Sequence, residues 1–487
     1  MVLVVCAAVG AYGITAPTSL ATIANDITTT FFRGLDWFFL ASVTAILVLS
    51  LWLAFGPAGR IVLGKEGEEP EFSTMSWLAM LFCAGMGIGL LFWGVAEPLI
   101  HYSGAPGSDP GTPAAARRAL VLTGFHWGLH AWAIYGIAAL VLAYFGFRKG
   151  YPYLPGAPIR AAFSGKWVKV VADASDLIAI LAVVFGVGGA ITMGIFQMQT
   201  GIALVTGKGS GSLTLSTVIL AVTFVAYMAS ALTPIDRGIM WLSNLNMVMA
   251  IGLLLVVIVF GPTAFLFETF ITSVGDYASN LASLSLRLYP YGDGQEWLYG
   301  WTLTYFIWWI AWAPFVGVFI ARISRGRTIR EFVLGVLVAP TMFSLLWFAV
   351  FGGAGLYSEI HGDIGLAHLV HEDVTASLFA LLDTLPFPTV LGGLSIVLIF
   401  IFLVTGVDSA TIVLGMLTTR GSLDPPVKRK IAWGVVLAVL AGALMLSDDP
   451  YAVRGVSIIG AIPFTFILLL QSVALLRALR DEKKNAE

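Results

Sequence analysis

The sequence predicts an all-α polytopic membrane protein with twelve transmembrane helices. Of its 487 residues, 58% are hydrophobic and only 11% are charged, a composition that soluble domains of this length do not show. Eleven apolar stretches are each long enough to cross a bilayer. They are residues 36 to 57, 75 to 100, 118 to 147, 175 to 205, 212 to 232, 239 to 266, 296 to 321, 331 to 356, 386 to 418, 430 to 447 and 453 to 476. We therefore expect these apolar helices to contact membrane lipid. The net charge of −2 points to no nucleic-acid partner.

Residues 1 to 17 form a shorter apolar segment, which we count as the twelfth span. It lacks the positive n-region of a signal peptide. With the N-terminus inside and twelve crossings, all but six of the 26 Lys and Arg residues fall on the cytoplasmic side. The six exceptions are Arg33, Arg117, Arg118, Lys208, Arg287 and Arg454. The positive-inside rule thus favours an inner (plasma) membrane protein with both termini in the cytoplasm.

Two interruptions suggest how the spans are organised. Gly85-Met86-Gly87-Ile88-Gly89 lies inside the run from 75, and Ala313-Pro314 lies inside the run from 296, five spans later. Because five is odd, corresponding helices cross in opposite directions, as inverted-topology repeats require. Close packing of helices through small residues is the alternative reading of such positions.

The domain plan that follows has four parts. Residues 1–60 hold two peripheral N-terminal helices, 75–266 the first five-helix repeat, and 295–479 the second, inverted repeat. Between the repeats, 267–289 is expected to form an amphipathic helix on the outer membrane surface. Its apolar side carries Ile271, Val274, Leu281, Leu284 and Leu288.

An aromatic cluster lies deep in the run from 296. The segment WTLTYFIWWIAWAP places Trp308, Trp309 and Trp312 about half the bilayer depth from its start, where interface-anchoring tryptophans do not belong. On a helix these three fall within an arc of about 100°. Packing against neighbouring helices is one explanation. The other is a site for an organic cation that attracts its ligand through π faces.

A second aromatic segment, FHWGLHAWAIY, lies in the middle of the run from 118. On one continuous helix Trp127, Trp132 and Tyr135 would cover about 140°, enough for two walls of an aromatic cage. His126 and His130 share a helical face at i and i+4. Without an evident third ligand, we expect them to make structural hydrogen bonds rather than to bind a metal.

Together, AGMGIGLLFWGVAEP, HWGLHAW with Tyr135, and WTLTYFIWWIAWAPFVGVFIARISRGRTIREF resemble the betaine/carnitine/choline transporter family of secondary carriers. The resemblance implies a LeuT-type fold with two inverted five-helix repeats, commonly assembled as homotrimers. It also implies a substrate site rather than an enzyme active site. The substrate site would contain an aromatic box formed by Trp127, Trp132, Tyr135 and Trp309. Trp308 would line the site and Trp312 the cytoplasmic path. The stretch Gly85, Met86, Gly87 and Gly89 would complete the site.

The glycine stretch bears on the charge of the substrate. An unwound helix offers backbone N–H groups to a carboxylate while the onium end occupies the box. In the family that this chain resembles, carriers of choline tend to have Asp where this chain has Gly87. The resemblance therefore favours a zwitterion such as glycine betaine, dimethylsulfoniopropionate, carnitine or ectoine.

No cofactor is expected beyond a coupling ion. The resemblance implies a candidate sodium site formed by Cys83 and Met86 on one side and by Phe402, Thr405 and Gly406 on the other. Gly406 stands where a second hydroxyl is usual, and sodium prefers several hard oxygen ligands. The nearby intramembrane Asp408 either carries a coupling function or pairs locally and braces the helices.

The resulting hypothesis is a secondary active transporter that takes up a methylated onium zwitterion by alternating access, with ion-coupled symport. Sodium-independent exchange of carnitine-type zwitterions is the first alternative. A membrane receptor or osmosensor whose box only binds its ligand is the second. Uptake into proteoliposomes, as opposed to binding alone, distinguishes these classes.

Overall fold

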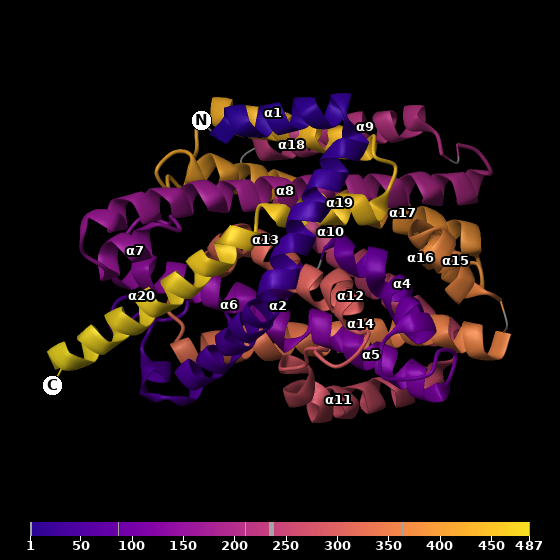
Figure 1. Ribbon diagram of the computed structural model, residues 1–487, viewed down its shortest axis with the longest axis horizontal. Helices are drawn as coiled ribbons and strands as arrows, with labels where there is room; N and C mark the ends of the chain where they lie inside the picture. Colours follow the sequence, from indigo (N-terminus) through magenta and orange to yellow (C-terminus); the bar gives the residue numbers. More distant parts are fainter. Residues whose placement is uncertain (1, 86, 210, 233–237, 363, 487) are drawn as a thin grey trace.

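The structure, a computed structural model, describes residues 2–85, 87–209, 211–232, 238–362 and 364–486, and these fold into helices joined by short connections (Figure 1). The first half contains α1 (Val2–Thr15), α2 (Pro17–Phe55), η1 (Pro57–Arg60), α3 (Thr74–Gly85), α4 (Ile88–Gly104), α5 (Pro113–Trp127), α6 (Leu129–Ala143), η2 (Tyr144–Arg148), α7 (Ala157–Ala162), α8 (Lys166–Thr206), α9 (Leu213–Leu232) and α10 (Gly238–Phe260). The second half contains α11 (Thr263–Ser285), α12 (Gln295–Leu298), η3 (Tyr299–Leu303), α13 (Thr304–Ile323), α14 (Ile329–Gly362), α15 (Leu366–Glu372), η4 (Val374–Ala376), α16 (Ser377–Leu382), α17 (Pro388–Leu417), α18 (Val427–Met445), α19 (Pro450–Ile459) and α20 (Ile462–Ala486).

Nine helical segments among the described residues are long and apolar enough to cross a membrane. They are Pro17–Phe55, Pro113–Arg148, Lys166–Thr206, Leu213–Leu232, Leu242–Phe260, Gln295–Ile323, Ile329–Gly362, Pro388–Leu417 and Ile462–Glu482. Helix α1, helices α3 and α4, and helix α18 fall in the predicted spans 1–17, 75–100 and 430–447, but they lie outside this set. The chain is thus an all-helical polytopic membrane protein, and the count of twelve stays a prediction.

The first expected interruption is confirmed. Helix α3 ends at Gly85 and α4 begins at Ile88, with Gly87 in extended backbone (φ −119°, ψ −158°). The second expected interruption, at Ala313-Pro314, is wrong, because α13 runs without a break through Pro314. A proline removes one backbone donor but need not end a membrane helix that is packed on all sides, and Pro314 is buried.

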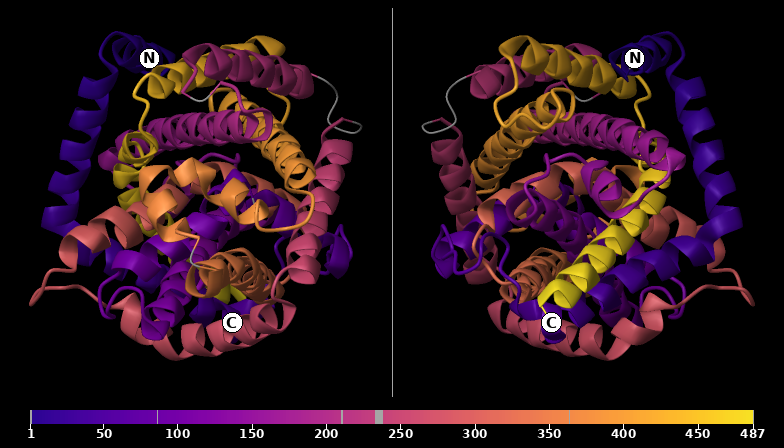
Figure 2. Two further views of the ribbon diagram at one scale, coloured as in Figure 1. Left: turned by 90° about the vertical axis from the view of Figure 1, so that its right-hand side faces the viewer. Right: turned by 90° about the vertical axis from the view of Figure 1, so that its left-hand side faces the viewer.

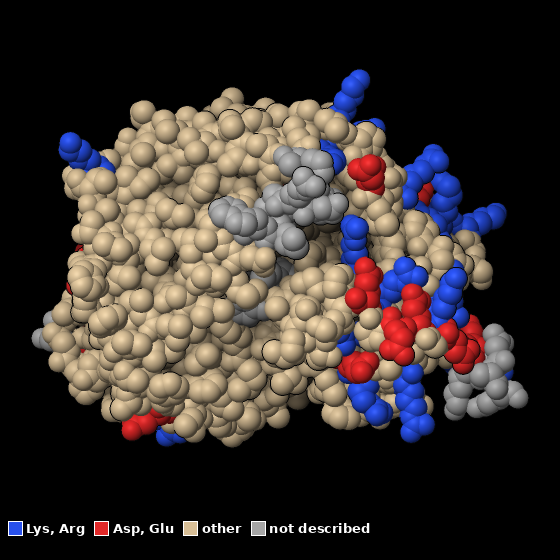
Figure 3. Space-filling model, turned by 180° about the vertical axis from the view of Figure 1, so that it is seen from behind, with Lys and Arg blue, Asp and Glu red and all other residues tan. Residues whose placement is uncertain are grey.

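The core of the bundle forms where α13 packs along α6, with α4, α8, α14 and α17 around them. Helices α1, α9 and α18 lie side by side along one edge, at the top of Figures 1 and 2. Helix α11, in the region of the predicted surface helix, covers the outside of α5 and α14 at the opposite edge (Figure 2). Charged side chains gather at the end of the molecule that carries the C-terminus, beside a wide uncharged face (Figure 3).

Candidate functional site

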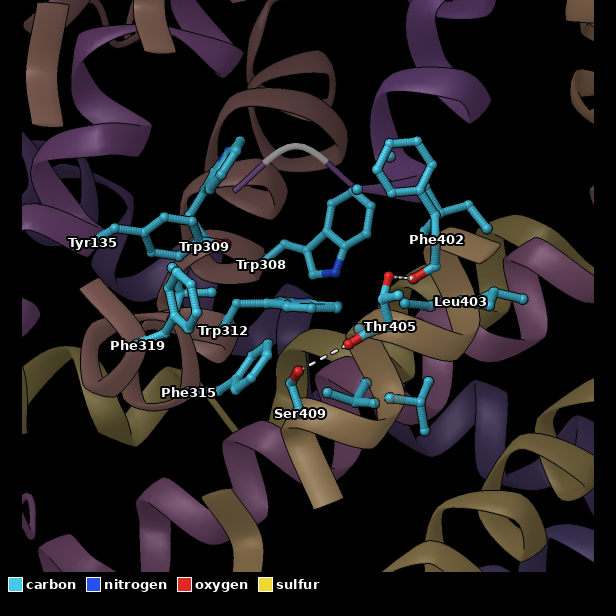
Figure 4. Close-up of a pocket in the computed structure, with 18 of the residues that line it drawn as sticks. Tyr135, Trp308, Trp309, Trp312, Phe315, Phe319, Phe402, Leu403, Thr405 and Ser409 are labelled. Atoms are coloured by element: carbon cyan, nitrogen blue, oxygen red, sulfur yellow. Dashed lines mark hydrogen bonds between the residues drawn. The ribbon is translucent and has the colours of Figure 1, made fainter. Parts of the chain in front are cut away.

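A cavity of about 180 Å³ lies inside the bundle between α4, α5, α6, α8, α10, α13 and α17. Its lining consists of Gly87, Ile88, Gly89, Trp127, Tyr135, Val187, Ala190, Ser243, Trp308, Trp309, Trp312, Phe315, Val316, Phe319, Phe402, Leu403, Thr405, Gly406, Val407 and Ser409. Figure 4 shows the aromatic side chains of α13 facing Phe402 and Thr405 of α17 across this space. None of these lining residues carries a formal charge, so the cavity offers π faces and dipoles to a ligand instead of an ion pair.

Trp309 is the centre of an aromatic cage. Its ring lies 5.4 Å from that of Trp127 at 86° and 5.0 Å from that of Tyr135 at 68°. The Nε1–H of Trp309 donates to the carbonyl oxygen of His126 at 2.9 Å, which fixes the plane of the ring. Edge-to-face pairs of this kind are the arrangement that aromatic rings prefer. These contacts fix the orientation of the three rings relative to one another.

Trp132 lies behind the cage and is not among the lining residues. It is fully buried, and its ring packs 5.8 Å from Tyr135 and 6.3 Å from Trp309. The expected 140° arc on one helix was wrong, because the helix ends at Trp127 and a new one begins at Leu129. Trp127 and Trp132 thus belong to different helices, and Trp132 supports the cage from outside.

The helix break at Gly128 is closed by a side chain from α11. The Tyr277 hydroxyl accepts a hydrogen bond from the Leu129 N–H at 2.9 Å. A Cβ at residue 128 would lie 2.6 Å from that hydroxyl oxygen and 2.5 Å from the carbonyl oxygen of Gly124. Only glycine fits here, and the break turns Trp127 toward the cavity.

The start of α4 forms another wall of the cavity. Gly87, Ile88 and Gly89 line it, and a Cβ on Gly87 would meet no atom within 4 Å. The first N–H groups of a helix have no partner within it and carry partial positive charge. Gly89 also lets the ring of Trp127 approach, since a Cβ there would be 2.7 Å from its Cη2. Gly85 ends α3 before this wall, while Met86 lies outside the described residues.

Trp308 and Trp312 extend the aromatic lining along α13 toward Phe315 and Phe319 (Figure 4). The Nε1 of Trp308 is buried and has no hydrogen-bond partner among the described residues. A buried N–H without an acceptor is costly. A ligand with a carboxylate could supply that acceptor.

The candidate sodium residues on α17 also face the cavity. Phe402, Thr405 and Gly406 line it, whereas the side chain of Cys83 lies outside the described part of the chain. The Thr405 hydroxyl donates to the carbonyl oxygens of Ile401 at 2.9 Å and Phe402 at 3.3 Å, which leaves its lone pairs available to a cation. The structure adds Ser409, one turn later, whose hydroxyl donates to the carbonyl oxygen of Thr405 at 2.9 Å.

A family model described as betaine/carnitine/choline family transporter matches residues 1–484 of this sequence. The chain belongs to this family. The glycine betaine transporter OpuD of Bacillus subtilis is 40% identical over 486 residues, which cover 99% of this chain and 94% of that protein. The ectoine/hydroxyectoine transporter of Virgibacillus pantothenticus is 41% identical, with coverage of 98% and 94%. A glycine betaine transporter of Acinetobacter baylyi is 40% identical, with coverage of 96% and 70%.

In this betaine/carnitine/choline-type transporter, Asp408 pairs locally. It is fully buried, and its carboxylate accepts hydrogen bonds from Ser230 of α9 and from Ser409 at 3.0 Å. The local pairing that the bracing interpretation expects is therefore present, and a coupling function for Asp408 stays a prediction. Because Ser409 also lines the cavity, the brace and the cavity wall share a residue.

Both histidines of the second aromatic segment make hydrogen bonds. His130 contacts the Ser285 hydroxyl at 3.1 Å through Nε2. His126 contacts Thr302 Oγ1 at 2.9 Å through Nε2 and Glu97 Oε1 at 2.6 Å through Nδ1. The two histidines thus serve different partners and do not form one site.

Sequence reasoning missed Glu97, which the transporter buries completely behind the cage. A carboxylate oxygen of Glu97 and one ring nitrogen each of His101 and His126 lie within 4.8 Å of one another, a grouping that could suit a metal. The separations of 2.6 and 3.3 Å between Glu97 and the two rings are hydrogen-bond distances, however, and the second carboxylate oxygen is taken by other donors. The available signal was a carboxylate in an apolar run, which by default is functional.

Proposed function

We propose that this transporter takes up a methylated onium zwitterion, such as glycine betaine, dimethylsulfoniopropionate, carnitine or a similar compatible solute, by alternating access. The observation that carries the proposal is one uncharged cavity with an aromatic cage and free N–H groups on its walls. A zwitterion needs both features at once. A soluble anion or a simple cation would use only one of them.

The cage suits the cationic end. A trimethylammonium or dimethylsulfonium group donates no strong hydrogen bond, so an ordinary polar pocket gains little from it. The faces of Trp127, Trp309 and Tyr135 attract its charge, each good face contributing about 0.5 to 2 kcal/mol when water is excluded. All three rings are largely buried.

The start of α4 and the indole of Trp308 suit the anionic end. Both present donors to the cavity, and neither brings a formal charge. A carboxylate is stabilised by the partial positive charge of a helix N-terminus. Choline has no carboxylate of its own. Because residue 87 is glycine and not aspartate, the cavity also offers no carboxylate to pair with the charge of choline.

Two of the relatives are glycine betaine transporters, which supports this substrate class. The third transports ectoine and hydroxyectoine, which are zwitterions but carry no methylated onium group. We infer that the cavity opens to the cytoplasm. Its lining runs along α13 from Trp308 to Phe319 and along α17 from Phe402 to Ser409. Both directions lead to segments rich in Lys and Arg, which favours an inner membrane protein with cytoplasmic termini.

Ion-coupled symport is the preferred mode. Thr405 and Ser409 present two hydroxyl groups to the cavity at i and i+4, and hard oxygens are the ligands that sodium prefers. Sodium-independent exchange is the second candidate, and one observation favours it: Gly406 brings no side-chain ligand where a hydroxyl is usual.

The test is uptake of radiolabelled zwitterions into proteoliposomes. We expect saturable accumulation of at least one onium zwitterion that depends on an inward sodium or proton gradient. Accumulation that requires preloaded zwitterion and ignores both gradients would favour exchange. Binding without any transport would contradict the proposal and favour a receptor.

A further inference from the structure

A carboxylate stands directly behind one wall of the aromatic cage. The Nε1–H of Trp127 donates to Glu97 Oε2 at 2.8 Å, while the six-membered ring of the same indole reaches toward Gly89 at the cavity wall. The hydroxyl of Tyr305 donates to the same oxygen at 2.6 Å. The indole of Trp127 therefore connects Glu97 to the cavity.

The hydrogen-bond pattern fits an ionised Glu97 if His126 and His101 are the donors to Oε1. Oε2 receives two bonds, one from an indole that can only donate. Oε1 faces His126 at 2.6 Å and His101 at 3.3 Å. An ionised carboxylate has about four acceptor sites, so these four contacts match its capacity.

No Lys or Arg nitrogen among the described residues lies within salt-bridge distance of this carboxylate. The neighbouring charged group is Arg454 of α19, whose guanidinium lies 4.9 Å over the ring of Trp301 and 5.9 Å over that of Tyr305. Arg454 makes no salt bridge with Glu97, although the two groups are close enough to interact electrostatically. On the cavity side, Glu97 has no Lys or Arg partner among the described residues, and a cation bound in the cage would add a positive charge there.

We propose that Glu97 is a positioning residue that makes the cage selective for a positively charged ligand. Its charge acts through the Trp127 N–H, because a hydrogen bond to an anion increases the electron density of the indole and chains of hydrogen bonds polarise one another. A cation over that ring is then held more strongly than a neutral group of the same shape. The inference rests on the proposed function and extends it from the lining residues to a residue that does not touch the substrate.

The same carboxylate also aligns the cage. His126 is held by Glu97 through its ring and holds Trp309 through its backbone carbonyl. A merely structural role would therefore weaken every ligand that fits the cage. The charge role would weaken only cationic ligands, and this difference is measurable.

The experiment compares two ligands on the purified full-length transporter by calorimetry. Glycine betaine carries a trimethylammonium group, and 3,3-dimethylbutanoate carries a neutral tert-butyl group on the same carboxylate. Glu97→Gln removes the charge and keeps the size of the side chain, while one of its two acceptor oxygens becomes an amide donor. We expect it to weaken glycine betaine about tenfold, the size of one strong cation–π contact, and to leave the neutral ligand within about twofold.

Two further variants serve as controls. Glu97→Asp keeps the charge and is expected to preserve the ratio of the two affinities, even if both fall. Thr302→Val removes the neutral partner of His126 Nε2 and is expected to preserve the ratio as well.

An equal loss of both ligands in Glu97→Gln, or no loss of either, would overturn the inference while leaving the proposed function intact. If Glu97→Gln does not fold, Glu97→Asp decides. A loss of the preference for glycine betaine over 3,3-dimethylbutanoate in that variant would also overturn the inference. A wild-type protein that binds no onium zwitterion in a wider panel would instead overturn the proposed function, and the inference with it.

Discussion

Replacing Trp309 by alanine removes the ring around which the cage is built. The loss of one π face is expected to cost about 1 to 2 kcal/mol of binding free energy, or roughly five- to thirtyfold in affinity. The upper end is expected, because Trp127 and Tyr135 both rest against this ring. Trp309→Phe keeps a face but loses the hydrogen bond to His126, worth about 1 kcal/mol, and should retain part of both binding and transport.

The assay is calorimetric binding of glycine betaine and uptake into proteoliposomes, with folding checked by size-exclusion chromatography and thermal melting. A buried Trp→Ala substitution also destabilises a protein by about 3 to 5 kcal/mol, so a control is needed. Trp433 is fully buried on α18, outside the cavity lining, and Trp433→Ala should lower the melting temperature without changing affinity. If Trp309→Ala folds and still binds and transports like wild type, the rings of the aromatic cage only pack against one another and do not bind the substrate.

Four other substitutions test two walls of the cavity and the helix break at Gly128. Gly87→Asp has room for its Cβ and should let choline compete for uptake while weakening zwitterion binding by like-charge repulsion; unchanged zwitterion affinity and no choline competition would contradict this. Gly406→Ser, also in open space, should strengthen sodium stimulation of the initial uptake rate at fixed membrane potential. Strong sodium dependence already present in wild type, and lost in Thr405→Ala, would show that residue 406 is not needed. Gly128→Ala should collide with Tyr277 and lower the melting temperature, and an unchanged melt would show that the break relaxes easily.

The features that could be predicted depend on residues close together in the sequence. Apolar runs revealed most of the spanning helices, and three glycines within five residues marked the break before α4. The single Gly128 gave no such warning, because isolated glycines are common inside membrane helices. What ends the helix there is Tyr277, which the sequence alone does not place near it.

The cage was predictable in composition but not in construction. Trp127, Tyr135 and Trp309 were selected as aromatic residues deep in apolar runs, and they do line one cavity. Trp132 was expected in the cage from the resemblance and from a continuous helix; the helix is broken, the ring packs behind those of Tyr135 and Trp309, and its place in the substrate site stays a prediction. Glu97 was overlooked because His126, Trp127 and Tyr305 come from two other helices, α5 and α13, which only the folded chain brings to it.

The long separations within this cage have a consequence for biosynthesis. Leu129 meets Tyr277 148 residues later, and Glu97 meets Tyr305 208 residues later. A nascent chain that has inserted only its first half therefore exposes a helix break without its acceptor and a carboxylate without one of its donors. Such groups are costly in a membrane, so the newly made half should depend on the translocon or a chaperone until α13 arrives. Ligand binding can begin only once the ribosome has passed Trp309.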